Sequence, residues 1–233
     1  MAIRAVLFDV GGPIDIEVEH ERLIDAAIRE SVVCEGLEVD HERYAAACAF
    51  AVASFAPDAY AAIAWHLCDR DETATRRVLE QIRAGSDARN AQRGGIELRP
   101  GVGEMLGRLH ARGLRLGLAA NQPPRVIAEL DRHGIGQLFS HREVSGHHGY
   151  RKPDVRLFLR ALDDLGVAPS EAIMVGDRID NDIVPARLLG MRTVLIRTGR
   201  HAEQQPRSPD EVPDAEVFDV AGMEAALNAL ASG

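Results

Sequence analysis

AIRAVLFDVGG (residues 2–12) and AIMVGDRIDND (residues 172–182) are the two stretches that most strongly indicate the architecture of this chain. In each, a short apolar run ends at an aspartate. Runs that are apolar throughout are typical of buried parallel strands, because both faces of a parallel sheet are covered. Ligands of open α/β sheets bind beyond the carboxyl ends of the strands, so the acidic residues lie where a binding site is expected.

Similar apolar runs alternate with amphipathic segments along much of the chain. Strands are predicted at Ala5–Phe8, Arg115–Ala119, Ala172–Val175, Thr193–Ile196 and near Ala215–Phe218. Helices are predicted at 102–112, 124–133, 154–165 and 180–189, the last three closed by Gly134, Gly166 and Gly190. This alternation predicts an α/β fold with a Rossmann-like parallel sheet and helices on both faces. The polar segment Gly199–Asp214 has no periodicity and predicts a surface loop.

Residues 15–98 break the alternation. The stretch has helical patterns at roughly 19–33, 40–55, 58–69 and 71–84 and no clear strand pattern. We therefore predict an all-helical domain at 15–98, inserted after the first strand of a core domain made of 1–14 and 99–233. Pro100-Gly101 marks the return to the core.

Composition excludes several classes of protein. The formal net charge of -9, without a long basic run, argues against nucleic-acid binding. No apolar stretch reaches the ~20 residues that span a bilayer. Three scattered cysteines and the absence of a signal-peptide pattern predict a cytoplasmic protein without disulfides. The oligomeric state cannot be predicted from these features.

The basic residues are almost all arginine, and Lys152 is the one lysine among 27. Chance is one explanation. The other is that this position requires a compact ammonium on a flexible stem, which a guanidinium does not replace. Lys152 precedes Pro153 at the start of a predicted helix, from which it can reach toward a bound phosphate.

Acidic and amide side chains follow the strand at 172–175. Asp177, Asp180, Asn181 and Asp182 offer the oxygen ligands that Mg²⁺ prefers. Alternatively, Asp180 caps the next helix and Asp182 complements its dipole. That alternative gives no reason for the Gly176-Asp177 step.

Two other strand ends carry candidate site residues. Asp9 is followed by Gly11-Gly12, which would let the backbone curl around an anion or a metal, although an Asp after a strand often only caps a turn. Ala120-Asn121 ends the second predicted strand, where backbone N–H groups and Asn121 can form an anion site.

Together and in this order, these motifs resemble the haloacid dehalogenase-like hydrolase superfamily, in its helical-cap subclass. The family signature is a nucleophilic Asp, a Ser or Thr often followed by Asn, a lysine, and a GDxxxxD pair. The matching positions here are Asp9, Ala120-Asn121, Lys152, and Asp177 with Asp182. The resemblance covers the predicted core, and the insert has the position and size of the family's cap.

The resemblance implies a Mg²⁺-dependent phosphatase that acts on a small phosphorylated metabolite. Asp9 would attack phosphorus and form an aspartyl-phosphate that water hydrolyses. Asp9, Asp177 and the carbonyl of Gly11 would hold the metal, with Asp182 acting behind them. The groups expected around the phosphate are Gly11, Gly12, Ala120, Asn121 and Lys152.

Two positions depart from the family signature. Gly11 replaces the usual second Asp, whose acid–base role is worth ~10²–10⁴ in rate. Ala120 replaces the usual Ser or Thr, and losing one such hydrogen bond reduces rate ~10²–10³-fold. Two hypotheses follow. One is a phosphatase that prefers leaving groups able to depart unprotonated, such as acyl or aryl phosphates. The alternative is a weak or inactive protein of this fold that acts as a metal-binding, phosphate-binding or interaction module.

Other family activities fit the residues less well. A phosphonatase needs a cap lysine, and residues 15–98 contain none. A phosphoglucomutase relies on the missing second Asp, and a 2-haloacid dehalogenase would not need the acidic cluster. Tyr60 and Trp65 are interpreted as packing residues, although a cap that faces the site could use either for substrate, and His147-His148 are interpreted as a solvent-exposed pair. The substrate cannot be read from the sequence, because specificity would reside in the cap.

Overall fold

The computed structural model describes residues 2–232 and divides into two compact units. Met1–Ile16 and Ile96–Gly233 form one, called the core unit here, and Glu17–Gly95 form the other, called the helical unit. The expected domain boundaries, after residues 14 and 98, lie close to the observed ones after Ile16 and Gly95.

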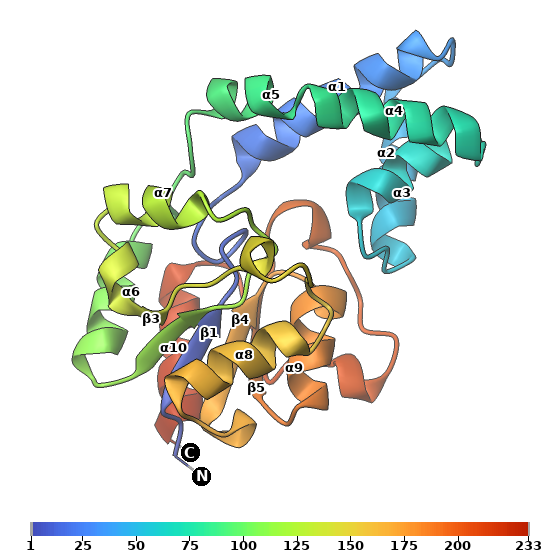
Figure 1. The fold of residues 1–233 in the computed structure, drawn as a ribbon. Helices are drawn as coiled ribbons and strands as arrows, with labels where there is room; N and C mark the ends of the chain where they lie inside the picture. The colour runs from blue at the N-terminus through green and yellow to red at the C-terminus, as the bar shows by residue number, and fades with distance from the viewer. Residues whose placement is uncertain (1, 233) are drawn as a thin grey trace. The chain divides into compact units, whose positions relative to one another are not determined.

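The core unit is built on a six-stranded parallel sheet (Figure 1). Its strand order is β3-β2-β1-β4-β5-β6. The strands are β1 (Ala5–Phe8), β2 (Arg115–Leu118), β3 (Phe139–His141), β4 (Ala172–Gly176), β5 (Arg192–Ile196) and β6 (Ala215–Val217). Their parallel pairing confirms the predicted α/β, Rossmann-like class.

Strand register brings three strand ends level. Phe8, the last residue of β1, pairs with Leu118 of β2 and with Val175 of β4. Asp9 therefore leaves the sheet beside the residues that follow β2 and β4. The edge expected to carry a site is formed by the central strands.

Helices cover both faces of the sheet. Val6 and Phe8 belong to one apolar cluster, and Ala5 and Leu7 to another, as the period-two alternation of a strand requires. The first cluster includes residues of α6 (Val102–Ala111), α7 (Val126–Arg132) and α10 (Val220–Ser232). The second includes residues of α8 (Arg156–Leu165) and α9 (Val184–Leu188).

Two features of the core differ from the expected elements. Strand β3 was not predicted, because three residues at a sheet edge are too short for a periodic pattern. The helix expected at 180–189 is divided into a π-helical turn at Ile179–Ile183 and α9. Single π-helical turns often occur at functional sites, and this one carries Asp182.

Helices are the only regular secondary structure in the helical unit. All residues of this unit lie in the described part of the chain. The helices are α1 (Val18–Cys34), α2 (His41–Ala53), α3 (Ala59–Leu67), α4 (Glu72–Ala84) and α5 (Ser86–Arg93). Side chains of Asp40, Asp58 and Asp71 accept hydrogen bonds at the starts of α2, α3 and α4. Helix α5 was not predicted, because it buries no residue and has no apolar pattern. Within residues 2–232, no helix combines the length and apolar character that crossing a membrane requires.

Candidate active site

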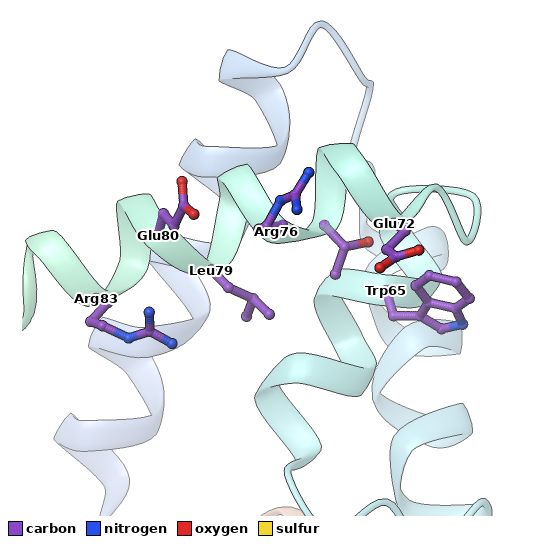
Figure 2. Close-up of a pocket in the computed structure, with 7 residues that line it drawn as sticks. Trp65, Glu72, Arg76, Leu79, Glu80 and Arg83 are labelled. Atoms are coloured by element: carbon purple, nitrogen blue, oxygen red, sulfur yellow. The ribbon is translucent and has the colours of Figure 1, made fainter.

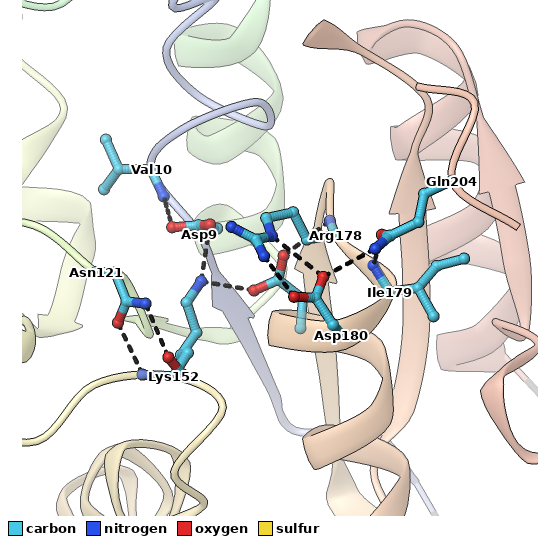
Figure 3. Close-up of polar contacts among 9 residues, drawn as sticks. Asp9, Val10, Asn121, Lys152, Arg178, Ile179, Asp180 and Gln204 are labelled. Atoms are coloured by element: carbon cyan, nitrogen blue, oxygen red, sulfur yellow. Dashed lines mark hydrogen bonds and ion pairs between the residues drawn. The ribbon is translucent and has the colours of Figure 1, made fainter. Parts of the chain in front are cut away.

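Asp9 stands at the carboxyl end of β1, where its backbone N–H donates to the carbonyl of Val175 at 2.9 Å. The side chain is half-buried. Its Oδ1 accepts from the backbone N–H of Val10 at 2.7 Å, and its Oδ2 lies 2.7 Å from Lys152 Nζ (Figure 3). The turn after β1 and the ammonium therefore hold this carboxylate in one orientation.

Lys152 is buried, with a side chain only 1% exposed. Its Nζ lies 2.6 Å from Asp182 Oδ1 as well as 2.7 Å from Asp9 Oδ2. Burial by itself lowers the pKa of this amine, but the carboxylates of Asp182 and Asp9 outweigh burial and the pKa is raised. The side chain is thus an ammonium that bridges two carboxylates.

Asn121 fixes the backbone of Lys152. Its Nδ2 donates to the Lys152 carbonyl at 3.0 Å, and the Lys152 N–H donates to Asn121 Oδ1 at 2.8 Å (Figure 3). Both polar ends of the amide are therefore used within the protein. The sequence predicts this side chain at a phosphate; in the structure its oxygen and its nitrogen both bind the backbone of Lys152.

The anion site expected at a helix start after Asn121 is also different in the structure. Helix α7 begins only at Val126, and its first N–H groups donate to carbonyls of Pro123 and Pro124. Ala120 is fully buried, and its carbonyl accepts from the Ser145 N–H at 3.0 Å. The strand end after β2 thus offers a methyl group where the family has a hydroxyl.

Close approaches at Gly12 and Gly176 explain why both positions are glycine. Gly12 has φ +81°, and a Cβ there would lie 2.6 Å from Cβ of Asp177. A Cβ at Gly176 would lie 2.2 Å from Cγ of Asp182. These distances are impossible between carbon atoms that are not bonded to each other, so the Gly176-Asp177 step makes room for Asp182.

Asp182 is fully buried beside Lys152. Its Oδ2 accepts from the Arg178 backbone N–H at 3.0 Å. Burial raises the pKa of Asp182 to about 6, and Asp9 acts in the same direction, although Lys152 opposes both. The carboxylate is kept ionised near neutral pH chiefly by the ammonium next to it.

The acidic residues also meet the requirements of a metal ion. Asp9, Asp177 and Asp182 each offer a carboxylate oxygen, and these oxygens lie within 4.8 Å of one another. Three carboxylates and one ammonium leave a net charge of about -2, which a divalent cation would balance. Oxygen donors of this kind suit Mg²⁺. Asn181 Oδ1 is buried and has no hydrogen-bond partner among residues 2–232, so a further oxygen acceptor occurs next to Asp182.

Gly11 belongs to the same turn as Gly12. Both glycines are buried, and the Gly12 N–H donates to the Asp15 carbonyl at 2.9 Å. Of the expected site residues, the structure thus brings Asp9, Lys152, Asp177 and Asp182 together. It places Gly11 and Gly12 in the adjoining turn and uses the Asn121 side chain elsewhere.

Arg99 joins two loops next to this site and was not expected to have a site role. Its Nε donates to the Gly12 carbonyl at 2.8 Å, and its Nη2 donates to Thr198 Oγ1 at 3.0 Å. Burial lowers the pKa of Arg99, and the charge of Asp177 opposes that shift. The only sequence signal was its place in Arg99-Pro100-Gly101, where the chain returns to the core.

Gln204 is a second residue that the sequence did not reveal. It lies in the segment predicted as a surface loop, yet it is only 2% exposed. Its Oε1 accepts from the Ile179 N–H at 2.8 Å, and its Nε2 donates to Asp180 Oδ1 at 3.1 Å (Figure 3). Asp180 also pairs with Arg178 and does not cap the helix. The loop thus holds the π-helical turn that carries Asp182.

The helical unit has a pocket of its own, with a volume of about 350 Å³ (Figure 2). It is lined by Trp65, Glu72, Thr75, Arg76, Leu79, Glu80 and Arg83. Trp65, interpreted above as a packing residue, is therefore partly available to a ligand. Tyr60 instead packs edge-on against His20, with ring centroids 6.1 Å apart.

The sequence is similar to those of known phosphatases. Over 123 residues the chain is 40% identical to the glyceraldehyde 3-phosphate phosphatase of Methanopyrus kandleri, a match covering 51% of each chain. Over 142 residues it is 38% identical to the phosphoserine phosphatase of Thermus thermophilus, covering 60% of this chain and 55% of that one. The matches span about half the length of these curated relatives.

Solved structures show the same fold over nearly the whole chain. A predicted phosphoglycolate phosphatase from Haemophilus somnus superimposes with a TM-score of 0.71 at 20% identity, covering 97% of this chain and 98% of that one. A HAD phosphatase from Thermococcus onnurineus gives 0.62 at 23% identity, with the same coverage. A family model described as haloacid dehalogenase-like hydrolase matches residues 3–190. With four of its signature residues gathered at one edge of the sheet, this chain belongs to the haloacid dehalogenase-like hydrolases.

Proposed function

We propose that this protein is a Mg²⁺-dependent phosphatase that hydrolyses small phosphate monoesters through Asp9. The observation that carries the proposal is the pairing of the half-buried Asp9 carboxylate with a buried ammonium, 2.7 Å apart, at the carboxyl end of the sheet. The phosphatase names of the two relatives that are 40% and 38% identical support it.

Asp9 is the proposed nucleophile. Its Oδ1 is held by the Val10 N–H, and its Oδ2 contacts Lys152. Attack on phosphorus would form a bond from one of these oxygens and expel the leaving-group oxygen, giving an aspartyl-phosphate. Water would then cleave the new phosphorus–oxygen bond and restore the carboxylate.

Lys152 is proposed to stabilise the transferring phosphoryl group. Its ammonium lies beside the attacking oxygen, and Asn121 and Asp182 hold it there. A fixed positive charge in a water-poor site stabilises developing negative charge more strongly than the same charge would in water. Asp182 thus has a positioning role and keeps Lys152 charged.

Asp9 and Asp177 are the residues that would hold Mg²⁺, with the Gly11 carbonyl as a further candidate and Asp182 acting behind them. When bound, the ion supplies positive charge that offsets the repulsion between the carboxylates and an anionic substrate. The helical unit is proposed to act as a cap that selects the substrate.

The proposal is tested by Mg²⁺-dependent release of p-nitrophenol from p-nitrophenyl phosphate. Asp9→Asn keeps an acceptor for the Val10 N–H but removes the nucleophile, so we expect at least a ~10³-fold loss of turnover. Asp154→Asn is the matched control, because Asp154 pairs with exposed Arg156 near Lys152 and its loss should leave activity unchanged. No turnover by the wild type, with Mg²⁺ binding intact, would favour a binding protein of the same fold.

Because Gly11 cannot donate a proton, the dependence of rate on the leaving group is a second test of the proposal. Without an acid at this position, rate should fall steeply as the leaving-group pKa rises, so aryl and acyl phosphates should outpace alkyl phosphates. Gly11→Asp should restore activity on alkyl phosphates. A flat dependence on leaving-group pKa would show that another residue supplies the proton.

A further inference from the structure

A second cluster of potential metal ligands lies in the core unit, away from the residues discussed above. His141 ends β3, Glu143 follows in the next loop, and Asp164 lies on α8. Each offers one ligand atom, and the three atoms lie within 4.8 Å of one another. Residues from three consecutive parts of the chain thus converge on one point.

His141 supplies a buried nitrogen to this cluster. Its side chain is 1% exposed, and its Nδ1 lies 2.9 Å from Asp164 Oδ2. The other ring nitrogen, Nε2, has no hydrogen-bond partner within the described part of the chain. The two ring nitrogens point in different directions, so Nδ1, which faces Asp164, is the atom that an ion at this cluster would use.

His148 approaches the same cluster from the loop, although we had interpreted His147-His148 as a solvent-exposed pair. The His148 side chain is only 14% exposed, and its ring stacks on Tyr150 at an interplanar angle of 11°. Its Nε2 lies 3.1 Å from Glu143 Oε2 but makes no hydrogen bond within residues 2–232. The two atoms are therefore close without the alignment that a hydrogen bond requires.

Arg160 is the cation that now lies between the two carboxylates. Its Nε is 3.2 Å from Glu143 Oε2, and its Nη2 is 3.7 Å from Asp164 Oδ1. The arginine side chain is 44% exposed. An exposed guanidinium at these distances is weakly held, so it can move into solvent and leave the carboxylates to another cation.

From these contacts we infer that His141, Glu143 and Asp164 form a binding site for a divalent ion of the Zn²⁺ type, with open positions left for water. Zn²⁺ binds imidazole nitrogen and carboxylate oxygen at about 2.0–2.2 Å, which places neighbouring ligand atoms roughly 3.4 Å apart in a tetrahedron. The three ligand atoms lie within 4.8 Å of one another, and His141 Nδ1 is 2.9 Å from Asp164 Oδ2, so side-chain rotations would bring them to this spacing. Mg²⁺ prefers oxygen ligands and would be disfavoured here.

Such an ion would join β3, the loop after it and α8. The same loop continues to Lys152, four residues beyond His148. Binding would therefore fasten the segment that delivers the active-site ammonium without contacting that site. The inference does not depend on the proposed phosphatase activity, because metal binding is measured without turnover.

The test is titration of the full chain with Co²⁺ in excess Mg²⁺, followed by visible absorption, and with Zn²⁺ followed by thermal melting. Cys34→Ser and Asp177→Asn, combined in the background protein, remove the exposed thiol and weaken the acidic site. We expect one Co²⁺ to bind per chain and to give the intense visible bands of a four-coordinate site. We also expect Zn²⁺ to raise the melting temperature.

Variants decide whether the ion binds at this cluster. Glu143→Gln and Asp164→Asn, both at partly exposed side chains, should each weaken binding at least about tenfold. Arg160→Gln should strengthen it, by about tenfold, because the competing cation is removed. His110→Gln, on the exposed surface of α6, is the control and should change nothing. Absence of the Co²⁺ bands, or bands unaffected by Glu143→Gln and Asp164→Asn, would overturn the inference.

Discussion

The core unit and the helical unit differ in the polar side chains that they bury. Among the described residues, the buried polar or charged side chains of the helical unit are Ser31 and Thr75. Those of the core unit are Asp15, His141, Lys152, Asn181, Asp182, Thr193, His201, Gln204 and Glu211. Every buried Asp, Glu, Lys and His of that set thus lies in the unit that carries the candidate active site, whereas the buried ionisable side chains of the helical unit are the uncharged Tyr44 and Cys68.

The physical cost of burial makes this difference informative. Removing a charge from water is unfavourable unless it is paired and hydrogen-bonded, so a unit that needs only to fold can bury apolar side chains instead. The helical unit does so with residues such as Ile28, Ile63 and Val78. Among the buried charges of the core unit, Lys152 and Asp182 are the pair that the candidate active site requires.

The largest effect is expected when Lys152 is removed. Lys152→Met leaves Asp9 and Asp182 without their shared cation and should lower the free energy of unfolding by ~3–5 kcal/mol, as for other broken buried pairs. Urea denaturation at neutral pH in EDTA measures this change. Activity should also fall by ~10²–10³-fold.

Acid should partly rescue that variant. Without the ammonium, the pKa of buried Asp182 rises further, so the folded state takes up a proton that the unfolded state does not. The deficit in stability should then shrink as pH falls below the raised pKa. A variant as stable as the wild type at neutral pH would contradict the view that burial makes this cluster costly.

His201 should make the stability of the core unit depend on pH. Burial, with Arg178 nearby, lowers the pKa of His201 from 6.5 to about 3. Between these values the unfolded chain binds the extra proton, so this contribution is complete above 6.5 and is lost as pH falls toward 3. We expect a loss of about 2 kcal/mol between pH 6.5 and about pH 5. His201→Gln, compared with exposed His110→Gln, should flatten that part of the profile.

Gln204 tests whether buried amides in the loop support the site. Gln204→Leu removes the acceptor for the Ile179 N–H and the donor to Asp180, and should lower stability by ~1–3 kcal/mol. If the loop positions the π-helical turn, kcat should fall more than KM changes. An unchanged kcat in a destabilised protein would limit Gln204 to a structural role.

The smallest effect belongs to the helical unit. Arg22 pairs with Glu19 on α1, and both side chains are well exposed. Arg22→Gln should change the free energy of unfolding by less than ~1 kcal/mol, because water and salt already screen such pairs. A loss as large as that of Lys152→Met would remove the distinction between the two units.

Much of the fold could be predicted because its signals are local. Ala5–Phe8 is a strand as expected, and the other predicted strands match to within a residue or two. The elements that were not predicted lack such a local signal. Strand β3 has three residues, and α5 buries none, so neither leaves a periodic pattern in the sequence.

The candidate site was predictable to a similar extent. Asp9, Lys152, Asp177 and Asp182 each follow or precede a recognisable element, and parallel strands bring their ends together. The roles of Asn121 and Gln204 could not be foreseen, because each depends on hydrogen bonds to backbone that is distant in sequence. No local pattern records where such a bond ends.

The burial of the single lysine also provides a way to measure how often the loops around it open. Lys152 carries the only side-chain primary amine, and it is almost inaccessible to solvent. An amine-directed reagent that modifies it must wait until the surrounding loops separate. The rate at which Lys152 is modified would therefore report how often the loops separate. Ligands that bind at the site should lower this rate.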